Sequence, residues 1–166
     1  MKKVYLLLFL SHISIVALCQ NHPFPNHTSY PGAHALPTAY TQTELDQIVS
    51  NFYDQWIAAY LTSCQSGLYI EYQPNTNATV SEAHGYGMMI TAYMAGHDAQ
   101  AQQRFNGMYN YYKNHPSYLN ARLMAWKQIA CQDESPGYTD AATDGDIDIA
   151  FALLLAHEQW LSLIHI

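Results

Sequence analysis

The sequence predicts an all-α protein, and three observations support this class. Apolar residues recur at three- and four-residue spacing in several stretches, polar loops separate those stretches, and alternating strand patterns are almost absent. Successive helices joined by loops favour helix packed on helix. The 166 residues suffice for one domain with a hydrophobic core.

Residues 1–20 are predicted to be a signal peptide. Lys2 and Lys3 precede an apolar run that is too short and interrupted for a membrane span, and a small-residue cleavage pattern follows it. A lipoprotein anchor at Cys19 is the alternative, but the bulky Leu18 before it disfavours this. We therefore expect a secreted protein, extracellular or periplasmic, that does not associate with a membrane after cleavage.

Residues 21–40 are rich in Pro, His, Asn and Thr and predict an extended segment without a core of its own. A domain is expected over residues 41–166. Its first helix has an N-cap signature at Thr43, and one face of it carries an apolar stripe. That stripe is formed by Leu45, Ile48, Val49, Phe52, Trp56 and Tyr60.

The middle of the domain predicts a short extended segment at 67–72 and a polar loop at 73–80. A helix capped by Ser81 should run to about residue 97, and another should run from residue 98 to just before Pro116. Residues 118–130 are expected to be partly helical, with Leu119, Leu123 and Trp126 facing inward.

The last predicted helix starts at Asp144 and is apolar nearly all round, as in FALLLA over 151–156. A helix that is hydrophobic on every side is one buried among other helices. The preceding helices offer too little surface to cover it, so the predicted fold is incomplete within these residues.

The charge balance excludes some partners. The formal net charge is −7, and the predicted signal peptide contains two of the six basic residues and none of the thirteen acids. Without a basic patch, nucleic acid is a poor partner. Fourteen tyrosines and three tryptophans suit a neutral, hydroxylated ligand, because their flat rings stack on sugar faces and hydrogen-bond at their edges.

No metal or cofactor is predicted. The nine histidines form no HExxH motif, the cysteines form no CxxC motif, and phosphate-loop and dinucleotide fingerprints are absent. Cys64 and Cys131 could form a disulfide after export or remain two buried thiols, and both readings stay open.

Two segments place acids at predicted helix starts: SEAHGYGM at 81–88 and ATDGDIDIA at 142–150. Glu82 could simply complement the helix dipole, which contributes about 0.5 kcal/mol. A general acid would need burial or a second carboxylate to hold its proton. Gly85 and Gly87 favour a close neighbour, because each glycine inside a helix costs about 1 kcal/mol relative to alanine.

Asp144, Asp146 and Asp148 alternate, so in a helix they cannot all face one site. Asp144 could cap the helix or point into a site at its mouth, and Asp146 could hold a neighbouring loop. A calcium loop is rejected, because its glycine and glutamate positions hold Ile149 and Leu155.

These motifs resemble glycoside hydrolase family 8, a family of endoglucanases, xylanases, chitosanases and lichenases. The second segment leads into an apolar helix that ends in the family's A-x-x-x-W pattern at Ala156 and Trp160, and LMAWK at 123–127 also looks like the family. The resemblance implies an (α/α)6 toroid and an inverting mechanism.

By position, the resemblance implies that Glu82 is the general acid and that Asp144 helps to hold the distorted sugar and the attacking water. It likewise implies that Trp126 stacks on a sugar, and we expect Tyr86 in the same groove. The implied substrate is a β-1,4-linked polysaccharide, with cellulose-like glucan preferred over xylan and chitosan.

The resemblance also implies a longer protein, since family members are about twice this length and in most of them the catalytic base lies well after the second motif. We therefore expect the N-terminal half of a barrel: a monomeric fragment that lacks the base beyond residue 166 and is inactive alone. One alternative is a secreted, non-catalytic helical module that binds carbohydrate or a partner. Another is an α/α-toroid lyase or a hydrolase of a different family.

Overall fold

The computed structural model describes residues 24–27, 39–129 and 137–161. The predicted signal peptide and Cys131 lie outside these residues, as does most of the predicted 21–40 segment. Cys64 is free among the described residues.

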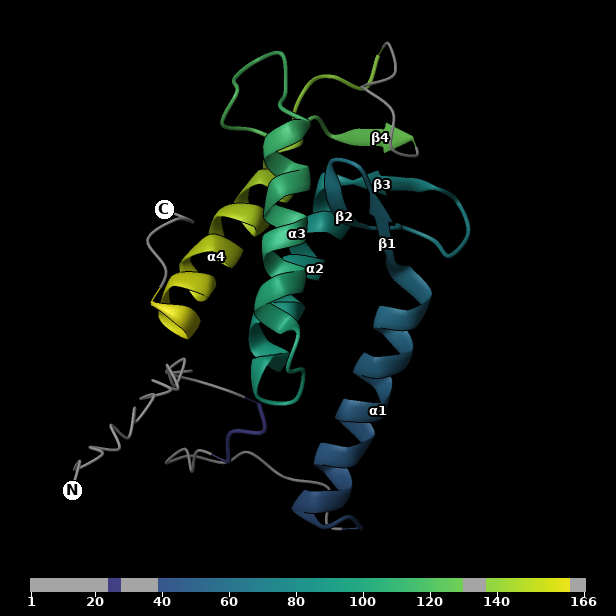
Figure 1. The fold of residues 1–166 in the computed structure, drawn as a ribbon, viewed down its shortest axis with the longest axis vertical. Coiled ribbons are helices and arrows are strands. Elements are labelled where there is room, and N and C mark those ends of the chain that lie inside the picture. The colour runs from purple at the N-terminus through teal and green to yellow at the C-terminus, as the bar shows by residue number, and fades with distance from the viewer. Residues whose placement is uncertain (1–23, 28–38, 130–136, 162–166) are drawn as a thin grey trace, which may run out of the picture.

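Helices dominate the described fold (Figure 1). They are α1 (Gln42–Tyr60), α2 (Ser81–Tyr93), the short 3-10 helix η1 (Met94–Gly96), α3 (Ala101–Asn114) and α4 (Thr143–Trp160). Within the described ranges, no helix combines the length and apolar character needed to cross a membrane. The predicted helical class is thus confirmed in its main elements.

Four short strands correct the all-α prediction. They are β1 (Leu61–Cys64), β2 (Gly67–Ile70), β3 (Ala78–Val80) and β4 (Lys127–Ile129). Strands β1 and β2 form an antiparallel hairpin, and β3 pairs antiparallel with β4, both at one end of the helices (Figure 1). The extended segment predicted at 67–72 corresponds to β2.

The prediction that residues 118–130 are partly helical is wrong, because residues 118–129 contain no helix. Its backbone instead bonds to other loops and to β3: Ser117 N–H donates to the Leu123 carbonyl, and Trp126 N–H donates to the Asp140 carbonyl. Leu119, which was expected to face inward, is exposed. Tertiary pairing has therefore overridden the local helical pattern.

Helix α1 begins two residues earlier than predicted, with Thr41 rather than Thr43 at the N-cap. The Thr41 side chain accepts a hydrogen bond from Glu44 N–H at 3.3 Å, and the Glu44 carboxylate accepts one from Thr41 N–H at 2.7 Å. This reciprocal pair is a capping box. The hydrogen bonds from Thr41 lower the pKa of Glu44.

The apolar stripe predicted on α1 lies largely open, and Phe52 is 70 % exposed. The buried residues of α1 are Ser50, Tyr53 and Ile57. Tyr53 and Ile57 form a small cluster with Met94, and the Tyr53 hydroxyl donates to Asp98 Oδ2 at 2.6 Å. A polar anchor and a short apolar contact thus fix this helix to the region between α2 and α3.

The main core lies among α2, α3, α4 and β2. Ile149, Ala152 and Ala156 of α4 are buried, whereas Ile147, Phe151 and Leu154 are exposed. Helix α4 is therefore not buried on every side among the described residues. Its small residues face α2, and its larger apolar residues form an uncovered face.

Two glycines allow α2 and α4 to cross closely near their N-termini. A Cβ at Gly85 would lie 2.6 Å from the Asp148 Cβ, and a Cβ at Gly145 would lie 2.8 Å from the Glu82 backbone nitrogen. Real Cβ atoms almost never approach other heavy atoms so closely. The predicted close neighbour of Gly85 is therefore helix α4.

Substituting Gly145→Ala should destabilise the protein by about 1–3 kcal/mol, because the added methyl group must push apart two packed backbones. Urea unfolding measures this change. Ile147→Ala, on the exposed face of the same helix, is the control and should change stability by less than about 0.5 kcal/mol. Equal effects of the two substitutions would contradict the close crossing.

Candidate active site

The N-terminal turns of α2 and α4 form the candidate site. Glu82 is the second residue of α2 and is half-buried, whereas Asp144 is the second residue of α4 and is exposed. The Gly145 backbone contacts the start of α2, so these two acids lie at adjoining helix ends. The structure therefore brings together the acids of both sequence motifs.

Neither helix start has a side-chain cap. The N-cap residues are Val80 and Ala142, which leaves Ser81 as the first helical residue rather than the predicted cap. The Ser81 hydroxyl donates to Glu82 Oε2 at 3.3 Å, and Gly145 N–H donates to Asp144 Oδ1 at 3.1 Å. Both carboxylates thus lie in first turns, where the helix dipole stabilises negative charge.

The carboxylates of the two helices interact electrostatically. Burial raises the pKa of Asp146, and the negative charges of Asp144 and Glu82 raise it further, although the Met124 hydrogen bond opposes them. Burial likewise raises the pKa of Asp148, with additional contributions from Asp144 and Glu82. A region where like charges crowd together favours carboxyl groups that hold a proton.

Asp146 holds a neighbouring loop, as predicted. Its Oδ1 accepts a hydrogen bond from Met124 N–H at 3.0 Å. Two residues further on, Trp126 N–H donates to the Asp140 carbonyl at 2.8 Å, and the Trp126 carbonyl accepts from Ser81 N–H at 3.0 Å. The backbone of Trp126 therefore joins the segments that lead into both acid-bearing helices.

Trp126 also belongs to an aromatic cluster that sequence reasoning missed. Its ring meets Tyr138 edge-on, with centroids 5.3 Å apart. Lys127 Nζ lies 5.0 Å from the ring centroid of Tyr138, 5.7 Å from that of Tyr72 and 5.9 Å from that of Trp126. The available signal was Lys127, a rare cation next to a tryptophan.

Tyr86 lies one helical turn beyond Glu82 and is 54 % exposed. It lines a hollow together with residues of α1 and β2, and Trp126 is not part of that lining. The two predicted sugar-binding aromatics therefore lie in different places around α2.

His84 is part of the core rather than of a cleft. Burial lowers its pKa to about 4, although the hydrogen bond with the Met108 carbonyl opposes this shift. Its ring also packs against Tyr111 at a centroid distance of 5.3 Å. In the described parts of the chain, no group of three or more His, Cys, Asp or Glu side chains could hold a metal ion.

Known proteins resemble this chain over most of its length. The sequence model of the family described as "Glycosyl hydrolases family 8" matches residues 31–163. A beta-glucanase of Niallia circulans is 50 % identical over 141 residues, which cover 84 % of this chain and 34 % of the relative. An endoglucanase of a Bacillus species is 38 % identical, covering 90 % of this chain and 34 % of its own length.

A solved structure also matches the fold. The apo structure of a beta-1,3-1,4-glucanase from Paenibacillus sp. X4 superposes with a TM-score of 0.80 at 48 % identity, covering 87 % of this chain and 38 % of that one. The chain thus spans about a third of the length of the curated relatives that it matches.

The buried His84 should make the protein less stable in acid. Its pKa falls from 6.5 to about 4 on folding, so between these values the unfolded chain binds a proton that the folded chain excludes. Stability should drop by about 3 kcal/mol from pH 7 to pH 4. The raised pKa values of Asp146 and Asp148 act in the opposite direction near pH 4.

Urea unfolding at several pH values measures this dependence. His84→Gln should flatten it, whereas Ile147→Ala, which changes an exposed side chain that does not titrate, should leave it unchanged. An unaltered pH dependence in His84→Gln would show that this histidine is not responsible.

Removing the Asp146 carboxylate should release the loop that carries Trp126. Asp146→Ala should accelerate hydrogen exchange of the Met124 amide at least tenfold, because a net hydrogen bond of about 1.5 kcal/mol to a charged group is lost. Asp146→Asn keeps an acceptor oxygen and should largely preserve the protection. Equal exchange in the Ala variant and the parent would contradict this tether.

Proposed function

This chain belongs to glycosyl hydrolases family 8, and we propose that it forms the acid-bearing part of a secreted endo-acting enzyme that cleaves β-1,4-linked glucan. The observation that carries this proposal is that Glu82 and Asp144 lie at two adjoining helix starts, and that the backbone of Trp126 is hydrogen-bonded to Ser81 at one start and to Asp140 just before the other. Export from the cell is part of the proposal and rests on the signal-like residues 1–20.

We assign the general acid to Glu82. Its proton would pass to the glycosidic oxygen as the bond to the anomeric carbon breaks, so that the departing sugar leaves as a neutral alcohol. The half-burial of Glu82 supports this role, as does its position beside Asp146 and Asp148, whose pKa values its negative charge helps to raise.

Asp144 would hold the distorted sugar and the attacking water, which suits an exposed acid beside the general acid. Inversion requires acid and base to stand about 6.5–9.5 Å apart, with water between them. We propose that the base belongs to the part of the longer relatives that this chain does not match. The 166 residues would then form part of an (α/α)6 toroid and would not turn over substrate alone.

A neutral, flat-faced sugar fits the aromatic side chains of the site. Trp126 would stack on one ring, and Tyr138 and Lys127 would fix its orientation. Two of the matched relatives are a beta-glucanase and an endoglucanase, and one of the matched structures is a beta-1,3-1,4-glucanase. Glucan with β-1,4 bonds, either cellulose-like or of mixed linkage, is therefore preferred over xylan or chitosan.

A chimera tests the assignment of Glu82. Residues 31–163 would replace the corresponding part of the Niallia circulans beta-glucanase, and hydrolysis of mixed-linkage glucan would be followed. Glu82→Gln should lower kcat by about 10²–10⁴-fold with little change in KM, because a general acid acts in the transition state. Substrates with an acidic leaving group should regain most of the lost rate.

Asp54→Asn is the matched control, since it removes an exposed carboxylate on α1 and should retain nearly full activity. A chimera that hydrolyses glucan equally well with Glu82→Gln would contradict the assignment. Product analysis that separates the two anomers would further distinguish inversion from retention, and unsaturated products would reveal a lyase.

A further inference from the structure

Ser81, the first residue of α2, is fully buried but does not cap its helix. The N-cap residue is Val80, and the Ser81 backbone N–H donates to the Trp126 carbonyl at 3.0 Å. A serine at a helix start ordinarily uses its hydroxyl oxygen to satisfy backbone N–H groups. Because Ser81 does not do so, the burial of its polar side chain needs another explanation.

The Ser81 hydroxyl contacts both the Glu82 carboxylate and the backbone of α4. It donates a hydrogen bond to Glu82 Oε2 at 3.3 Å. A Cβ added at Gly145 would overlap the Ser81 hydroxyl oxygen and would lie 2.6 Å from the Ser81 Cβ. Glycine at position 145 therefore lets α4 support this hydroxyl from close by.

This hydrogen bond restrains the Glu82 side chain. Consecutive residues of a helix do not face each other, so the carboxylate reaches the Ser81 hydroxyl only in a restricted set of side-chain conformations. Among the described residues, Ser81 is the one hydrogen-bond donor to this carboxylate. A glutamate has several rotatable bonds, and fixing them in advance removes that ordering cost from the reaction.

A second pair of a hydroxyl and a glutamate, at the start of α1, serves a different purpose. The Thr41 hydroxyl donates to Glu44 Oε2 at 2.8 Å and also accepts from the Glu44 backbone N–H. That exposed pair closes the end of a helix. At α2 the pair is more deeply buried, and in the described structure its hydroxyl bonds to the carboxylate alone.

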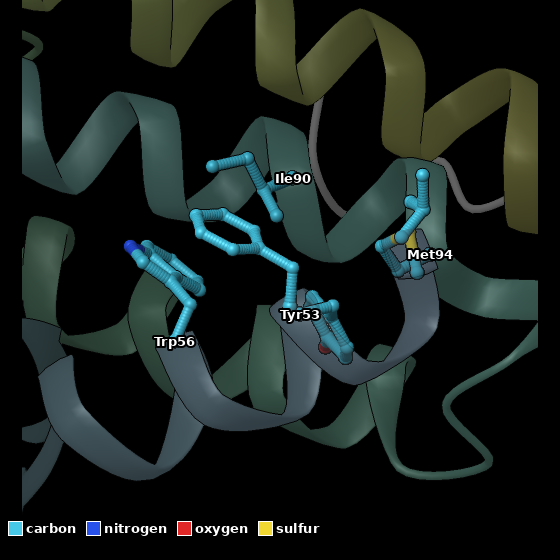
Figure 2. A pocket seen from close by; sticks show the side chains of 6 residues that line it. Tyr53, Trp56, Ile90 and Met94 are labelled. Carbon is cyan, nitrogen blue, oxygen red and sulfur yellow. The ribbon is translucent and has the colours of Figure 1, made fainter. Parts of the chain in front are cut away.

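Helix α1 carries another buried serine, Ser50, at a different place relative to α2. Ile90 and Met94, which α1 approaches, lie in the last turn of α2 and in η1, whereas Glu82 lies in the first turn. The apolar hollow between these elements is lined by Tyr53, Trp56, Ile90 and Met94, together with Val49 and Phe52 (Figure 2). Ser50 therefore provides a comparison for Ser81 outside the candidate site.

We propose that Ser81 is a positioning residue for the general acid: its hydroxyl, packed against Gly145 of α4, holds Glu82 Oε2 so that Oε1 presents the proton to the glycosidic oxygen. This inference rests on the proposed function. Catalytic hydrogen bonds commonly shorten when substrate binds, so a distance of 3.3 Å is compatible with this role.

The hydrogen bond should also strengthen during the reaction. The proton passes from Glu82 to the glycosidic oxygen, which takes the electron pair of the bond to the anomeric carbon as that bond breaks. Glu82 becomes an anion, while Ser81 keeps its own proton. A hydrogen bond to an ionised acceptor is stronger than one to a neutral acceptor, so Ser81 stabilises the transition state more than the ground state.

Kinetics of the chimera that carries residues 31–163 in the Niallia circulans beta-glucanase test the proposal. Ser81→Ala should lower kcat on mixed-linkage glucan about tenfold and leave KM within twofold, because a hydrogen bond to a developing charge is lost. A substrate with an acidic leaving group needs little proton donation, so its hydrolysis should stay within twofold. A serine with only a structural role would affect both substrates alike.

A double-mutant cycle shows whether Ser81 acts through Glu82. Ser81→Ala should cause no further loss in a chimera that already carries Glu82→Gln. Ser50→Ala is the matched control, because it removes the hydroxyl of another buried helical serine and should leave kcat unchanged on both substrates.

NMR measurement of three-bond couplings in the 166-residue chain tests the restraint without any activity. The Glu82 side chain should occupy one main rotamer in the parent and in Ser50→Ala, and should average among several rotamers in Ser81→Ala. The same couplings in all three chains would overturn the proposal, whatever the chimera does.

The outcomes separate this inference from the proposed function. If Glu82→Gln lowers kcat while Ser81→Ala changes neither substrate, the role of Ser81 is wrong and the proposed function stands. If Glu82→Gln has no effect, the assignment of the general acid fails and this inference fails with it. A loss in Ser81→Ala that is equal on both substrates, or that persists in the Glu82→Gln chimera, would also overturn the inference.

Discussion

The close crossing of α2 and α4 is the constraint on which the described structure depends. Gly85 and Gly145 remove the side chains that would hold the two backbones apart, and the Ser81–Glu82 backbone fits directly against the start of α4. Any larger residue at either position would separate the helix N-termini. Glu82 and Asp144, which are distant in sequence, would then no longer share one electrostatic environment.

Backbone hydrogen bonds also fix the position of Trp126 relative to the two helix starts. Trp126 bonds through its carbonyl to Ser81 and through its amide to Asp140, so its position follows that of both helix starts. Asp146 adds a third connection through Met124. Asp146 therefore positions a loop, as the sequence predicted, while Asp144 remains exposed at the helix start that adjoins the one with Glu82.

The sequence predicted the elements whose signals are local. Helical periodicity located α2, α3 and α4. The alternation of Asp144, Asp146 and Asp148 also predicted correctly that these side chains do not all face one site, since Asp146 bonds to the loop at Met124. Prediction from sequence failed where residues far apart in the chain pair with each other, as at β4, which pairs with β3, and in the loop before β4. The apolar stripe on α1 was predicted, but its exposure to solvent was not, because the burial of a helix face depends on which other elements pack against it. Trp126 was predicted as a site residue, but its cluster with Lys127, Tyr72 and Tyr138 was missed, because residues 72, 127 and 138 meet only in the fold.

The most direct test of the account is a carbon-detected NMR titration of Asp146 and Asp148 in the parent chain and in Glu82→Gln. The account holds that a carboxylate of α2 acts on carboxyl groups of α4, so removing the Glu82 charge should lower the pKa of both aspartates. Asp54→Asn should leave both titrations unchanged. Titrations of Asp146 and Asp148 that are identical with and without the Glu82 charge would contradict a shared site at the two helix starts.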